Sequence, residues 1–76
     1  MIGGYILINI AAGKGYDVLQ KLRAIPDIRK ADLVTGLHDI VAFVETNDLK
    51  KLTDDLMEKI RKIDGVTKTV TCIAVS

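Results

Sequence analysis

The residues with the greatest chemical potential stand together near the middle of the 76-residue chain, in the segment Thr35-Gly36-Leu37-His38-Asp39-Ile40. His38 and Asp39 place the single imidazole of the sequence beside a carboxylate, a combination that general acid–base catalysis uses. Adjacent residues in a hairpin diverge, and no serine or cysteine nucleophile lies at a recognisable spacing from this pair. We therefore interpret the segment as a solvated turn, and we expect no catalytic residue and no enzyme.

Two other segments resemble reactive motifs without completing them. Cys72 is the single cysteine, so the sequence predicts no internal disulfide and no Cys/His cluster for a metal. Its place in an apolar strand favours a small core residue over a reactive thiol. Gly13-Lys14-Gly15 looks like the end of a phosphate-binding loop, but the upstream glycine and the following serine or threonine are missing. We expect neither metal nor cofactor, and a reducing, cytoplasmic setting.

Basic and acidic side chains almost balance, with eleven Lys and Arg against ten Asp and Glu. Such a balance does not favour nucleic-acid binding by charge alone. The sequence also shows no helix-turn-helix segment and no paired exposed aromatics of the kind that stack bases on an RNA-binding sheet. No apolar run approaches the roughly 18 residues that a membrane span needs. We expect neither direct DNA binding nor membrane insertion.

Hydrophobic periodicity predicts the elements that must position these residues. Short β-branched runs predict strands, and apolar residues spaced by three and four predict helices. The strands are expected over 5–10, 28–35, 40–45 and 66–75, and the helices over 16–24 and from a cap at Asn47 or Asp48 to Ile63. Pro26 ends the first helix because it disfavours the helical conformation of the residue before it. Gly65 ends the second helix by adopting a left-handed conformation.

The order β-α-β-β-α-β predicts an α+β, ferredoxin-like domain that occupies residues 1–76. Right-handed crossovers place both helices on the same face of a four-stranded antiparallel sheet. One stripe of the second helix faces that sheet, formed by Leu49, Leu52, Leu56, Ile60 and Ile63.

The strands are apolar on both sides, which a sheet covered on one face does not need. Tyr5 and Leu7 alternate with isoleucines in the first strand, and Val41 and Phe43 alternate with Ile40, Ala42 and Val44 in the third. Strands of this kind are covered on both faces, and a large exposed apolar patch is uncommon on a monomer. We therefore predict a homodimer in which two sheets pack face to face about a two-fold axis.

Four segments together closely resemble one family, the C-terminal effector-binding domain of the leucine-responsive/AsnC (Lrp/AsnC) regulators, also called the RAM domain, for regulation of amino-acid metabolism. The similarity runs from about Gly4 to Val75. The segments that carry it are Ile25-Pro26-Asp27-Ile28, Val34 to Ile40, Lys59 to Val66, and Thr67-Lys68-Thr69-Val70-Thr71. The chain resembles the stand-alone form of this domain, which has no helix-turn-helix domain before it.

The resemblance implies a site for a free amino acid or a related small effector between dimers, with Gly36, His38, Asp39, Thr69 and Thr71 lining it. A carboxylate such as Asp39 can pair with the ammonium group of a zwitterion. Backbone N–H groups near Gly36 and the threonine hydroxyls can receive its carboxylate. His38 departs from the aromatic residue that the family often has there. The alternative is that Gly36 only makes the hairpin and Asp39 only bonds its own turn.

The leading hypothesis is an amino-acid-binding and oligomerisation module: a homodimer that assembles further, into an octamer or a decamer for example. The alternative from another functional class is a pure interaction module, which binds no ligand and co-assembles with full-length Lrp/AsnC regulators. An ACT-type regulatory domain shares the strand order, but it would normally be tethered to a catalytic partner. A small ferredoxin-like enzyme has the least support.

Overall fold

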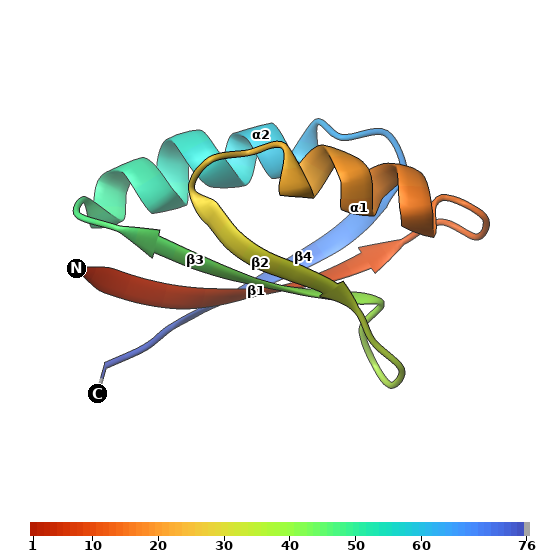
Figure 1. Cartoon of the computed structure of the whole chain (residues 1–76), viewed down its shortest axis with the longest axis horizontal. Helices are drawn as coiled ribbons and strands as arrows, with labels where there is room; N and C mark the ends of the chain where they lie inside the picture. Colours follow the sequence, from red (N-terminus) through yellow and green to blue (C-terminus); the bar gives the residue numbers. More distant parts are fainter. Residues whose placement is uncertain (76) are drawn as a thin grey trace.

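Four antiparallel strands form one sheet, and the helices cover one of its faces (Figure 1). This computed structural model describes residues 1–75. The elements in chain order are β1 (Ile2–Ile10), α1 (Gly15–Arg23), β2 (Ile28–Leu33), β3 (Ile40–Thr46), the π-helical segment η1 (Lys51–Leu56), α2 (Met57–Arg61) and β4 (Val66–Ile73). The predicted βαββαβ order and ferredoxin-like fold are therefore confirmed.

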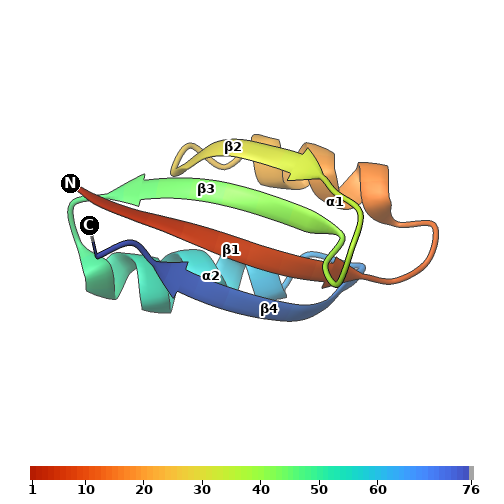
Figure 2. The same ribbon diagram turned by 90° about the horizontal axis from the view of Figure 1, so that it is seen from below.

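The strand order in the sheet is β2-β3-β1-β4, so β1 and β3 are central and β2 and β4 are edges. Both helices lie on the same side because each unit of strand, helix and strand crosses over in the right-handed sense. Figure 2, seen from below, shows the sheet in front with α1 behind the β2 edge and α2 behind the β4 edge. The predicted layer arrangement is correct.

The hydrophobic core lies between this helix layer and the inner face of the sheet. The central inner positions of β1 and β3 are fully buried, as their two-residue period predicts. The helices contribute the opposite wall. The buried apolar residues are Ile6, Ile8, Val18, Leu19, Leu22, Ile28, Ala31, Ile40, Ala42, Val44, Leu52, Leu56, Met57 and Ile60.

The opposite face of the sheet, here called the outer face, carries apolar side chains with no layer over them. Tyr5 is 46% exposed, and Leu7, Val41 and Phe43 are half-buried. The rings of Tyr5 and Phe43, which stand opposite each other on β1 and β3, lie 5.2 Å apart between centroids. The sequence prediction of two apolar sheet faces is confirmed, and the outer face remains available for a partner.

Cys72 belongs to this outer face, so its prediction as a small core residue is wrong. The register of β1 and β4 places Cys72 opposite Tyr5, and residues paired in this way share a face. Because β4 is an edge strand, neither a helix nor a further strand covers the thiol, and Cys72 is exposed.

The start of the second helix follows its predicted signal. Asp48 is the residue that caps the second helix: its Oδ1 accepts hydrogen bonds from the backbone N–H of Lys50 at 3.0 Å and of Lys51 at 3.4 Å.

The prediction that Gly65 ends the second helix is wrong: α2 ends at Arg61 with Lys62 as its cap. Gly65 has a positive φ of +102°, but it lies in the next turn, which the N–H of Val66 closes on the carbonyl of Ile63 at 3.2 Å. A Cβ at Gly65 would also lie 2.8 Å from Cβ of Lys14. Both the positive φ and this close approach therefore disfavour a side chain at position 65.

The sequence did not predict η1. Its π-type turns are wider than those of an α-helix and shift the phase of the side chains before them. Leu49 lies ahead of these turns and is 44% exposed, so its place in the buried stripe was wrong. Leu52, Leu56 and Ile60 are buried as expected, and Ile63 is partly buried against the core.

Replacing Asp48 with alanine should lower the free energy of unfolding by about 1 kcal/mol, because two N–H groups at the helix start lose their acceptor. For a domain of this size, the melting temperature should fall by about 4–8 °C. Asn47→Ala is the matched control, since Asn47 is exposed and its side chain forms no hydrogen bond within residues 1–75. Thermal melts at one protein concentration test this, and equal melting temperatures for the two variants would contradict it.

Candidate functional site

The predicted site segment is a hairpin loop that joins β2 to β3 at the end of the molecule opposite both termini (Figure 1). It bends to the side of the sheet away from the helices. β2 ends at Leu33, two residues before the predicted end at Thr35. The N–H of Val34 bonds across the base of the loop to the carbonyl of Asp39 at 2.9 Å. The loop is thus residues 34–39.

Gly36 allows this loop to turn. Its φ of +130° lies in the region that residues with a side chain rarely adopt, and a Cβ built there meets nothing within 4 Å. The constraint at this position is therefore backbone strain rather than lack of space. The next residue, Leu37, is 90% exposed and stands at the tip.

Asp39 is held firmly at the base of the loop. Its Oδ2 accepts a hydrogen bond from the backbone N–H of Ile10 at 2.8 Å, and its own N–H donates to the carbonyl of Ile8 at 2.9 Å. The side chain is half-buried, and Oδ1 accepts no hydrogen bond within residues 1–75. One oxygen of the carboxylate is therefore structural, and the other is oriented but free for a donor.

Asn9 ties the rest of the loop to the end of β1. Its amide Nδ2 donates to the carbonyl of Leu37 at 2.9 Å, and its Oδ1 lies 2.9 Å from Nδ1 of His38. The arrangement holds His38 half-buried between β1 and the loop. Sequence reasoning missed Asn9 as a site residue, although a polar side chain between Ile8 and Ile10 at the end of an apolar strand was the available signal.

Thr69 and Thr71, the two predicted residues outside the hairpin, lie on the edge strand β4. They pair with Ile8 and Ile6, so their side chains face the helix layer rather than the outer face. The hydroxyl of Thr71 donates to Sδ of Met57 at 3.2 Å and is therefore engaged inside the domain. The hydroxyl of Thr69 forms no hydrogen bond within residues 1–75.

The two groups of predicted residues do not meet in one protomer. Ile8 stands opposite Ile40 on one side and Thr69 on the other, so β1 lies between the Asp39 loop and β4. Two strand spacings amount to about 10 Å. The loop also bends to the side of the sheet away from the helices, whereas Thr69 and Thr71 face the helix layer, so the two groups lie on opposite sides of the sheet.

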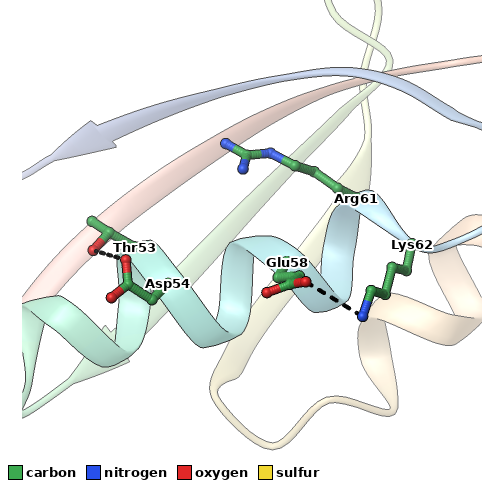
Figure 3. A pocket seen from close by; sticks show the side chains of 5 residues that line it. All are labelled: Thr53, Asp54, Glu58, Arg61 and Lys62. Atoms are coloured by element: carbon green, nitrogen blue, oxygen red, sulfur yellow. Dashed lines mark hydrogen bonds and ion pairs between the residues drawn. The ribbon is translucent and has the colours of Figure 1, made fainter.

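A further surface hollow lies elsewhere, on the solvent side of η1 and α2. It encloses about 570 Å³ and is lined by Thr53, Asp54, Glu58, Arg61 and Lys62. Figure 3 shows that Glu58 and Lys62 pair with each other, at 3.4 Å, across the solvent-facing helix surface. Its charges are of both signs, with Glu58 and Lys62 paired, and none of the predicted site residues lines it.

Comparison with known proteins decides which class of domain carries this hairpin. Residues 4–76 match the family described as the Lrp/AsnC ligand binding domain. The chain belongs to this family.

Relatives of this Lrp/AsnC domain agree with the match. An uncharacterized HTH-type transcriptional regulator of Pyrococcus abyssi is 36% identical over 75 residues, which are 99% of this chain and 48% of the relative. A hypothetical protein from Pyrococcus horikoshii shares 41% identity and a TM-score of 0.90 over 100% of this chain and 92% of that one. The chain spans about half the length of the curated relatives it matches. The family consists of ligand-binding domains of transcriptional regulators and not of enzymes.

A more distant neighbour shows the same fold with a ligand. The feast or famine regulatory protein Rv3291c from M. tuberculosis, complexed with L-methionine, has a TM-score of 0.85 and 21% identity, over 100% of this chain and 51% of that one. Within residues 1–75 of the present Lrp/AsnC domain, no helix is long and apolar enough to cross a membrane.

Proposed function

We propose that this Lrp/AsnC domain binds a free amino acid, or a small effector of the same charge pattern, between copies of itself. The observation that carries the proposal is the half-buried Asp39 carboxylate, which is fixed through Oδ2 and leaves Oδ1 oriented beside the exposed loop. A fixed carboxylate is suited to an ammonium group because charge-assisted hydrogen bonds are the stronger ones. The L-methionine complex of a protein with the same fold supports an amino acid as the ligand class.

The donors for the other end of the ligand come from β4. The hydroxyl of Thr69 is free of internal hydrogen bonds within residues 1–75, whereas that of Thr71 is engaged with Met57. Thr69 is therefore the stronger candidate of the two. Because Thr69 faces the helix layer and the Asp39 loop bends to the opposite side of the sheet, we propose that the site uses two copies of the domain.

The outer face of the sheet is suited to the contact between two copies of the domain. We propose a homodimer in which the apolar outer faces of two sheets pack together, with further association of dimers bringing the Asp39 loop of one to β4 of another. Both the two-sided apolar strands and the small size of the domain support it, since a chain this short buries only about 60% of its unfolded surface alone.

The domain is proposed to act in the cytoplasm and not to read DNA itself. A ligand-free module that co-assembles with full-length regulators would use the same outer face, because such regulators contain the domain that this chain matches. A thermal-shift screen with amino acids distinguishes the ligand-binding module from the ligand-free one.

A thermal-shift screen of the twenty amino acids should find at least one that stabilises the protein. A ligand held at about 100 times its dissociation constant contributes roughly 2.7 kcal/mol, which corresponds to a rise of about 10 °C or more in the melting temperature. The matching methyl esters and amides are the controls, since they lack the carboxylate. If none of the twenty shifts the transition, the co-assembly module becomes the better description.

A further inference from the structure

A small hollow where the chain passes from α2 to β4 carries positive charge without any acid. It encloses about 180 Å³ and is lined by Arg61, Val66, Thr67, Lys68 and Thr69. Four other hollows on the surface each include at least one aspartate or glutamate in their lining. Two cations that line one hollow without a carboxylate favour an anion from outside the chain.

Arg61 is the cation with the most specific chemistry. Within residues 1–75 it forms no ion pair, although the neighbouring Lys62 pairs with Glu58 at 3.4 Å. Figure 3 shows the Arg61 side chain extended away from that pair and toward β4. A guanidinium presents a planar fork of N–H donors that matches both oxygens of a carboxylate.

The open edge of β4 borders the hollow with further donors. The N–H of Ala74 bonds to the carbonyl of Gly3 at 2.9 Å, which sets the alternation of hydrogen bonds along the strand. In an antiparallel pair every second residue points its N–H away from its partner strand, so Thr69 and Thr71 present theirs to the free edge. The hydroxyl of Thr67 is already bonded to the carbonyl of Asn9, whereas that of Thr69 is not bonded within residues 1–75.

We propose that this hollow binds the carboxylate of the small effector, with Arg61 as the residue that requires a carboxylate. Arg61 forms the bidentate contact, Lys68 adds charge, and Thr69 donates its hydroxyl. The inference rests on the proposed function for the identity of the ligand, and it assigns to Arg61 the discrimination between an amino acid and the corresponding amine or amide.

The test uses sodium propionate as a carboxylate probe and propionamide as its uncharged match, added to perdeuterated, ¹⁵N-labelled protein. Propionate should move the amide resonances of Thr69 and Thr71, and propionamide should not. Arg61→Gln should weaken propionate binding by at least about tenfold, because a charged bidentate contact is lost. Arg61→Lys should lie between Arg61→Gln and the parent, since it keeps the charge without the fork.

Lys59→Gln is the matched control. Lys59 is exposed on the same helix, forms no ion pair within residues 1–75 and does not line this hollow. Equal propionate affinity in Arg61→Gln and the parent, or no resonance shift in the parent, would overturn the inference. If propionate binds through Arg61 but no amino acid stabilises the protein, the anion site stands and the proposed function fails. If an amino acid binds Arg61→Gln and the parent with equal affinity, the proposed function stands and the inference about Arg61 fails.

Discussion

Phe43→Glu should convert the protein to a monomer at micromolar concentration, while the parent remains a dimer or a larger assembly. Phe43 stands opposite Tyr5 on the two central strands, near the middle of the outer face, and its ring also covers Gly3. In the proposed dimer a glutamate at this position would be buried without a partner charge, which is strongly unfavourable. Light scattering or sedimentation measures the change directly.

The expected effect is large because a two-fold symmetric interface contains the substituted residue twice. Aromatic residues central to an interface contribute about 2 kcal/mol or more each. Two copies then amount to about 4 kcal/mol, which weakens the dimer by roughly a thousandfold. The buried core between the helices and the inner face does not include Phe43, so the separated monomer should keep its secondary structure. Circular dichroism at the same concentration checks this point.

Two variants control for size and for charge. Phe43→Leu removes the ring but keeps the position apolar, and it should leave the dimer largely intact. Gln20→Glu adds a carboxylate on the exposed surface of α1, remote from the outer face, and should change nothing. A Phe43→Glu protein that stays dimeric would show that the outer face is not the contact between copies.

Most of the fold was predictable because its signals are local. Alternating β-branched residues set the faces of β1 and β3, and a left-handed Gly65 makes the turn that precedes β4. The π-type turns of η1 were not predictable, since the apolar spacing of Leu52, Leu56 and Ile60 fits an ordinary α-helix equally well. Only the packed structure shows that Leu49 has turned away from the core.

The candidate site was harder to predict because its geometry depends on contacts between distant segments. The residue types of the hairpin were recognisable, but the bond from the Ile10 N–H to Asp39 joins residues 29 positions apart. The same holds for Thr71, whose hydroxyl reaches Met57 only because β4 pairs with β1 in one particular register. The direction of the Arg61 side chain toward β4 is likewise a result of the tertiary fold.

Asp39→Asn should remove about half or more of the stabilisation by an amino acid while leaving the fold intact. The amide oxygen of asparagine can still accept the hydrogen bond that Asp39 now receives from Ile10, so the base of the loop is preserved. The negative charge that would pair with the ammonium group is lost. A hydrogen bond to a charged group contributes about 1.5–3 kcal/mol, so affinity should fall by about ten- to a hundredfold. Titration calorimetry with the amino acid found in the screen measures this loss.

Asp39→Ala separates the two roles of the carboxylate. It removes the acceptor as well as the charge, and it leaves the partly buried N–H of Ile10 without its partner. We expect the same loss of ligand binding as in Asp39→Asn, together with a fall of about 1–3 kcal/mol in the free energy of unfolding. Lower stability in Asp39→Ala, with unchanged ligand affinity in Asp39→Asn, would mean that Asp39 only closes the hairpin. Full stability in Asp39→Asn with lost affinity would assign the free oxygen Oδ1 to the ligand, because charge is what this substitution removes.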